Sequence, residues 1–113
     1  MRIAATCPDD IAACASFHGA YLFEGKPTSP HLMLPKIKAR LLFGHAVEDR
    51  SMSAEAIAGL EEALKKWGGQ YENETYEGAL HGWTTLDNPA YNAPQALRAY
   101  EKLTALFAET LKQ

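Results

Sequence analysis

The sequence has few cysteines and no excess of positive charge, and each shortage excludes a class of protein. Cys7 and Cys14 are its two cysteines, too few for a disulfide framework and without zinc-type spacing. The formal net charge of −3 leaves no basic footprint, so we expect no nucleic-acid partner. The four histidines lie far apart and form no His-x-x-x-His pair. The sequence therefore predicts neither a metal site nor a cofactor.

Long apolar runs are missing as well. No run approaches the roughly 20 residues needed to cross a bilayer. The first ten residues lack the charged start, apolar stretch and cleavage site of a signal peptide. We therefore expect a cytoplasmic protein with no membrane partner. Repeats, low-complexity tracts and long linkers are also absent, and 113 residues is close to the commonest size of one domain, so residues 1–113 are expected to form a single domain.

Three short segments predict the strands of a small sheet. Residues 11–17, "IAACASF", are apolar or small throughout, which is typical of a parallel strand buried on both faces. Residues 37–43 form a second apolar run. Residues 70–76 predict a third strand, whose Glu72 and Glu74 would discourage further pairing at a sheet edge. The Pro- and Gly-marked segment 21–35 is expected to be a loop.

Periodic apolar residues predict two whole helices and the end of another. Residues 53–67 carry an apolar stripe, with Ser53 to cap the start and Gly68 to end the helix. Residues 92–112 are the last helix, and its expected buried stripe consists of Leu97, Tyr100, Leu103, Phe107 and Leu111. Residues 1–7 are expected to be the last turns of a helix. This order of strands and helices predicts an α/β fold with about three parallel strands and flanking helices.

Polar residues follow the end of each predicted strand. They are His18, Asp49 and His81, and ligands bind beyond the carboxyl ends of strands in open α/β sheets. An aspartate can hold one ring nitrogen of a histidine while the other nitrogen transfers protons. Asp49 and His81 are therefore the predicted catalytic residues, with the acid before the histidine as in α/β-hydrolases. The alternative is that Asp49 begins a turn and His81 is an ordinary loop residue.

A nucleophile for this pair is missing from the sequence. No Gly-x-Ser-x-Gly or Gly-x-Cys-x-Gly segment, which would hold a nucleophile on a sharp strand-to-helix turn, occurs in the 113 residues. Cys7 lies at the end of a predicted helix, and Cys14 lies inside a predicted buried strand, where a thiol is normally inert. We therefore expect no nucleophile-dependent esterase activity from these residues alone.

Four segments together resemble a known family. "IAACASFHG", "SPH", "FGHAVEDRSM" and "YEGALHGW" occur in this order and resemble the C-terminal half of the dienelactone hydrolase family of α/β-hydrolases, over about residues 2–111. The resemblance implies a partial α/β-hydrolase fold, with Asp49 as triad acid and His81 as triad histidine. It implies hydrolysis of a carboxylic ester or lactone by a Cys or Ser nucleophile that would precede Met1. A truncated gene, a split gene or a fragment would each give this sequence.

The resemblance also bears on substrate and partners. Family members that take carboxylate-bearing lactones carry an arginine shortly after the histidine, where this chain has residues 82–85, "GWTT". A neutral ester or lactone is therefore as consistent with the sequence as a carboxylate-bearing lactone is. Without the nucleophile strand, residues 11–17 would keep an unpaired edge, which predicts self-association or pairing with an N-terminal half. The alternative function is a non-catalytic binding or assembly module that keeps part of the fold.

Overall fold

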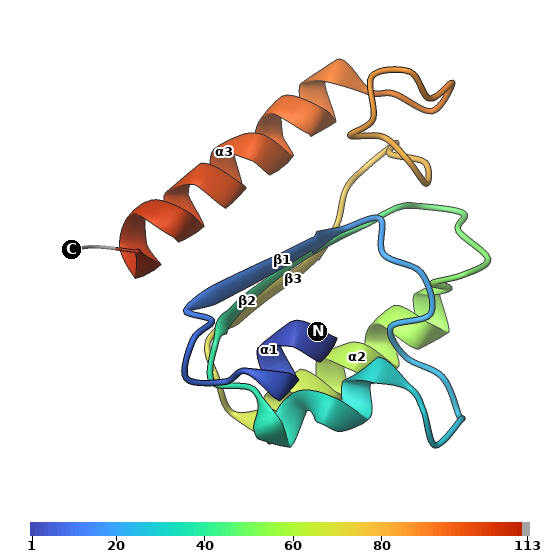
Figure 1. Ribbon diagram of the computed structural model, residues 1–113. Helices are drawn as coiled ribbons and strands as arrows, with labels where there is room; N and C mark the ends of the chain where they lie inside the picture. The colour runs from blue at the N-terminus through green and yellow to red at the C-terminus, as the bar shows by residue number, and fades with distance from the viewer. Residues whose placement is uncertain (112–113) are drawn as a thin grey trace.

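A three-stranded parallel sheet with helices on both faces forms the fold (Figure 1). The computed structural model describes residues 1–111. The strands lie in the order β1 (Ala13–Phe17), β2 (Arg40–His45) and β3 (Tyr71–Thr75). Because the strands are parallel and are paired almost from end to end, their three carboxyl ends lie at the same end of the sheet. The predicted α/β class with about three parallel strands is confirmed.

Helices cover the two faces of the sheet unequally (Figure 1). On one face lie α1 (Arg2–Thr6), the 3-10 helix η1 (Pro30–Lys36) and α2 (Ala54–Trp67), whereas α3 (Ala93–Thr110) lies on the other. The segment 21–35 was expected to be a loop throughout, but its end forms η1, which begins at Pro30, a residue whose fixed φ suits a first helical turn. Within residues 1–111, no helix combines the length and the apolar character needed to cross a bilayer.

Helix α2 forms as its sequence predicts. The Ser53 hydroxyl accepts a hydrogen bond from the N–H of Ala56, which caps the first turn. Gly68 ends the helix in a left-handed conformation with φ of 78°, which favours a residue without a side chain. Leu60 and Leu64 are fully buried in the larger core cluster against β2. Local capping and burial therefore agree along the whole helix.

Strand β1 is less buried than its sequence predicts. The expectation was a strand over residues 11–17 buried on both faces, but the strand is Ala13–Phe17 and all five of its residues are only half-buried. Among the described residues β1 pairs with β2 alone, so its other edge has no neighbouring strand to cover it. Strand β2 has a neighbour on each side and is the buried one. It also runs later than expected, over Arg40–His45 rather than residues 37–43.

Helix α3 faces the sheet with a different stripe from the one expected. Four of the five residues expected to be buried are exposed, namely Leu97, Tyr100, Phe107 and Leu111. The buried residues are instead Ala96, Ala99 and Leu106. These positions precede three of the expected ones by a single residue; Ala96 and Ala99 are buried in the cluster that contains Tyr76 and Trp83, and Leu106 lies near Leu41 and Leu42 of β2. The larger apolar side chains of α3 are thereby left toward solvent.

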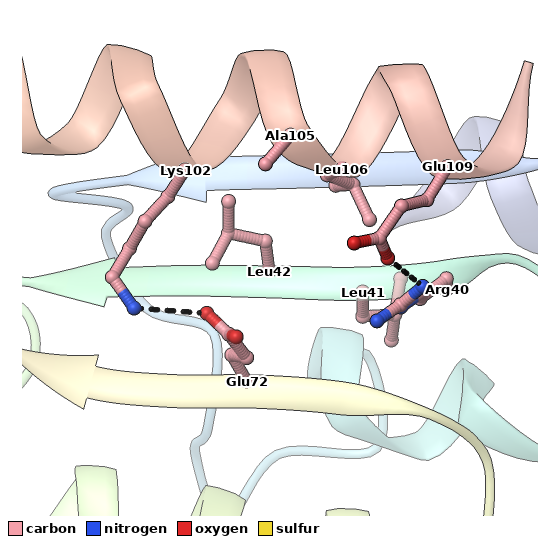
Figure 2. Close-up of a pocket in the computed structure, with 8 residues that line it drawn as sticks. All are labelled: Arg40, Leu41, Leu42, Glu72, Lys102, Ala105, Leu106 and Glu109. Atoms are coloured by element: carbon pink, nitrogen blue, oxygen red, sulfur yellow. Dashed lines mark hydrogen bonds and ion pairs between the residues drawn. The ribbon is translucent and has the colours of Figure 1, made fainter.

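Ion pairs link α3 to strands β2 and β3. Arg40 of β2 pairs with Glu109 at 2.5 Å, and Lys102 pairs with Glu72 of β3 at 3.1 Å (Figure 2). A small hollow of about 90 Å³ lies between these pairs, above Leu42. The Glu72 carboxylate thus lies on an edge strand, as predicted, but it also contributes to helix packing.

Candidate active site

Asp49 and His81 come together at the carboxyl end of the sheet. Asp49 lies in the loop after β2 and His81 in the loop after β3. The Nδ1 atom of His81 lies 2.6 Å from Oδ2 of Asp49. The Asp49 side chain is 6% exposed, whereas that of His81 is 48% exposed. The predicted approach of the two side chains is confirmed, and the imidazole combines a buried partner with an accessible face.

The two oxygens of the Asp49 carboxylate contact different residues. Oδ1 accepts two hydrogen bonds from Ser51, one from the backbone N–H at 2.9 Å and one from the hydroxyl at 2.6 Å, and Oδ2 faces His81. Burial alone raises the pKa of the Asp49 carboxyl, but the hydrogen bonds from Ser51 and His81 outweigh burial and hold it below its ordinary value. Asp49 is therefore ionised near neutral pH. Asp49 therefore forms a turn and contacts His81 at the same time, because the two contacts use different carboxylate oxygens.

The loop that carries His81 is held by backbone contacts rather than by regular structure. Gly78 and Gly82 have φ values of 69° and 94°, in the region that favours glycine. A side chain at Gly82 would also meet Asn88, with a Cβ only 2.6 Å from its amide nitrogen. The N–H of Val47, in the Asp49 loop, donates to the carbonyl of Ala79 at 2.7 Å. This bond ties the loop of the acid directly to the loop of the histidine.

An aromatic cluster fills the space beneath the His81 loop. Tyr76 and Trp83 are fully buried, with ring centroids 5.0 Å apart, and Phe17 of β1 packs against both rings edge-on. Trp83 serves either to line a pocket or to close the loop. Its full burial favours closure. The Tyr76 hydroxyl and the Trp83 indole nitrogen are buried and find no hydrogen-bond partner within the described part of the chain.

His18 joins the same site, whereas the other two histidines do not. His18 Nε2 lies 2.7 Å from the Thr84 hydroxyl, and the centroid of its ring is 5.2 Å from that of His81. His31 lies in η1 and contacts Ser29, while His45 is buried in β2. Within the described part of the chain, no group of three or more His, Cys, Asp or Glu residues is arranged to hold a metal ion.

Two site residues were missed in the sequence. Ser51 is not among the predicted site residues, although an aspartate two residues before a serine is a common turn pattern that indicates its contact with Asp49. Thr84 was noted because it is not an arginine, and its contact with His18 spans 66 positions, so no local pattern could indicate it. A hollow of about 600 Å³ adjoins the Asp49 loop and the start of α2; its apolar lining consists of Ala46, Val47, Met52, Ala54 and Ile57.

Comparison with known proteins assigns the fold and the family. The sequence profile of the "Dienelactone hydrolase family" matches residues 1–111. A Synechocystis protein named "Putative carboxymethylenebutenolidase" is 31% identical over 105 residues, which cover 90% of this chain and 43% of that protein. The crystal structure titled "Putative Dienelactone Hydrolase" from Klebsiella pneumoniae superposes with a TM-score of 0.82 at 21% identity, over 93% of this chain and 45% of that chain.

The two relatives agree on how much of the fold is present. This chain spans less than half the length of either relative, in line with the implied C-terminal half. The structural likeness supports the partial α/β-hydrolase fold, and the match of the family profile covers nearly every residue. The chain belongs to the dienelactone hydrolase family.

Proposed function

We propose that Asp49 and His81 are the triad acid and general base of a hydrolase that cleaves carboxylic esters or lactones. The observation that carries this proposal is the 2.6 Å contact between a buried Asp49 carboxylate and the half-exposed His81 imidazole. The nucleophile is proposed to come from the portion of the fold that this chain does not span, because no nucleophile elbow occurs among the 113 residues.

The proposed mechanism follows from the positions of the two ring nitrogens. The ionised Asp49 accepts the Nδ1–H of His81, so that Nε2 carries the lone pair that takes the proton of a Cys or Ser nucleophile. The nucleophile then adds to the ester carbonyl, and the imidazolium returns the proton to the departing alkoxide. In a second round, His81 takes a proton from water as the water oxygen adds to the acyl carbon; the bond from this carbon to the nucleophile then breaks, and the imidazolium returns the proton to the departing nucleophile, which releases the acid. Asp49 stabilises the imidazolium in both rounds.

The residues after His81 bear on the substrate class. Gly82, Trp83, Thr84 and Thr85 include no cation, and Trp83 is fully buried. This segment therefore offers no positive charge that could bind a carboxylate of the substrate, which supports a neutral ester or lactone. The name of the Synechocystis relative refers to a carboxymethylene-butenolide, which is a lactone that carries a carboxyl group, so this name supports the ester and lactone class as a whole and does not favour a neutral substrate.

A chimera tests the proposal. The portion of the Synechocystis relative that this chain does not cover would be fused ahead of Met1, and hydrolysis of a neutral aryl ester would be measured. We expect His81→Gln and Asp49→Asn to lower kcat by about 10²- to 10⁴-fold, the usual contribution of general acid–base catalysis. His31→Gln is the matched control and should leave kcat unchanged. The 113-residue chain alone should show no saturable turnover.

Two results would oppose the proposal. Chimera turnover that survives His81→Gln would remove His81 from the mechanism. Turnover by the isolated chain that disappears on substitution of Cys7 or Cys14 would place the nucleophile within these residues.

The second candidate function is a non-catalytic binding or assembly module that retains part of the fold. The exposed apolar side chains of α3, including Leu97 and Tyr100, and the open edge of β1 favour it. The DNA upstream of Met1 separates the two functions. An in-frame Gly-x-Cys-x-Gly or Gly-x-Ser-x-Gly segment supports the hydrolase, and a promoter with a ribosome-binding site supports the module.

A further inference from the structure

A second imidazole lies against His81. The ring centroids of His18 and His81 are 5.2 Å apart and the ring planes meet at 64°, so that the rings pack edge to face. His18 packs in the same way on Trp83, with centroids 5.1 Å apart, and its Nε2 meets the Thr84 hydroxyl at 2.7 Å. One side chain at the end of β1 thus contacts three residues of the four-residue segment that begins at His81.

His18 is itself held firmly in place. Its N–H donates to the carbonyl of Gly44 at 2.7 Å, which extends the β1–β2 ladder by one residue. Its φ of 43° lies in the left-handed region, which a residue with a side chain adopts at some cost. The ring contacts His81, Trp83 and Thr84, all of which follow the end of β3. Backbone and ring are therefore both fixed by contacts at the same place.

The segment that carries His81 depends on such an anchor. It contains no helix or strand, and the left-handed Gly82 follows the histidine directly. Thr84 is held from two sides, because its hydroxyl meets His18 and its carbonyl accepts a hydrogen bond from the Tyr100 hydroxyl of α3 at 3.0 Å. The bond between Asp49 and His81 fixes one ring nitrogen, but it leaves the ring free to rock about that bond unless something packs against its face.

We propose that His18 is the positioning residue of His81: its ring packs on the His81 ring, and its bond to Thr84 fixes the loop, so that the imidazole keeps the orientation in which Nδ1 meets Asp49. The inference deepens the proposed function, because it concerns the same site. His18 does not take part in proton transfer itself. Burial first, and the charge of a protonated His81 second, lower the pKa of His18. His18 is therefore neutral near pH 7 and adds no second positive charge beside the imidazolium.

Nuclear magnetic resonance of the 113-residue chain tests this role without any need for activity. In a sample with ¹⁵N-labelled histidine, the proton on Nδ1 of His81 should give a low-field signal that exchanges slowly with water and disappears in Asp49→Asn. We expect His18→Ala and Thr84→Val to speed its exchange at least tenfold. His18→Phe, which keeps a ring but loses the bond to Thr84, and Thr84→Ser, which restores the hydroxyl, should retain part of the protection. His31→Gln is the matched control.

A titration of His18 is a second test of its contact with His81. Because a protonated His81 lowers the pKa of His18, His81→Gln should raise the titration midpoint of His18. The results separate the two proposals. A wild-type signal that is lost in Asp49→Asn but unchanged in His18→Ala and Thr84→Val overturns the positioning role and leaves the Asp49–His81 pair in place. A wild-type chain with no Asp49-dependent signal overturns the pair itself, and with it the proposed function.

Discussion

Asp49 shows how one side chain serves a turn and a catalytic contact together. Ser51 holds one carboxylate oxygen and His81 meets the other. Both contacts favour the charged form, and together they overcome the effect of burial on the pKa of the carboxyl. The turn is therefore part of the site, because it orients the carboxylate and keeps it ionised.

Removal of the Ser51 hydroxyl should raise the pKa of Asp49. The hydroxyl is the largest of the contacts that lower this pKa, and Ser51→Ala leaves the backbone N–H in place. The pKa would be read from the carboxyl ¹³C shift during an acid titration. Ser53→Ala is a matched control, because Ser53 caps α2 and does not contact Asp49. An Asp49 titration that is identical in the wild type and Ser51→Ala would contradict this account of the turn.

His45 predicts how stability should depend on pH. Its side chain is buried in β2 and Nε2 lies 2.5 Å from Oδ1 of Asn73, while Nδ1 has no hydrogen-bond partner among residues 1–111. Burial lowers the pKa of His45 from its ordinary 6.5, so the unfolded chain binds this proton more readily than the folded chain. Stability should be complete above about pH 7 and should fall as pH drops through 6.5 toward the lower folded pKa.

Urea unfolding between pH 8 and pH 5 tests this sign. The free energy of unfolding should decrease over this range in the wild type and decrease less in His45→Gln. Burial also lowers the pKa values of His18 and His31, so part of the slope should remain in the variant. Asp49 contributes little here, since its ordinary pKa is 3.8 and its stabilisation is lost only at lower pH. A flat profile, or one that rises toward pH 5, would contradict the prediction.

At the scale of elements, the sequence predicts best where local and tertiary signals agree. Helix α2 has its cap, its stop and its buried stripe between Ser53 and Gly68, and each is found where the sequence places it. Strand β2 was predicted but displaced, because the apolar residues Ile37 and Ala39 are buried in the core without belonging to the strand. Apolar character alone does not distinguish a buried connection from a strand.

Helix α3 and strand β1 show why some features could not be read from the sequence. In α3 the large residues predict a buried stripe, yet the alanines at 96 and 99 are buried in the cluster that contains Tyr76 and Trp83. Which stripe faces inward depends on the residues against which the helix packs, and these are set by the tertiary structure. In β1, apolar residues predict burial, but burial also requires a neighbour on each edge. The pair Asp49 and His81 was predictable because parallel strands bring their ends together.

At the scale of the whole molecule, two uncovered apolar features need a partner. Strand β1 has no strand on its outer edge within residues 1–111, and α3 exposes Leu97, Tyr100, Phe107 and Leu111. The chain also spans less than half of its relatives. We propose that the outer edge of β1 pairs with another strand, from a second copy of this chain or from an N-terminal half. The β3 edge, which carries Glu72 and Glu74, is expected to stay unpaired.

The direction of the β1 hydrogen bonds identifies a variant that tests this pairing. Arg40 donates to the carbonyl of Ala12, and His18 donates to that of Gly44, so the even-numbered residues of β1 bond to β2. By alternation, the N–H of Ala15 points to the open edge. Proline there removes an outward donor without breaking the β1–β2 ladder, as proline does in edge strands. Ala15→Pro should therefore reduce association in sedimentation velocity while the far-ultraviolet circular dichroism stays the same.

A proline on the opposite edge is the matched control for this experiment. The N–H of Thr75 points away from β2 by the same alternation, because Tyr76 donates to the carbonyl of His45, and the residue is exposed. Thr75→Pro should leave association unchanged, since the proposed pairing uses the β1 edge at the other side of the sheet. Co-expression with an N-terminal half should suppress self-association by filling the β1 edge. A wild-type chain that sediments as a monomer at high concentration, with fast amide exchange at residues 13, 15 and 17, would rule out association through β1.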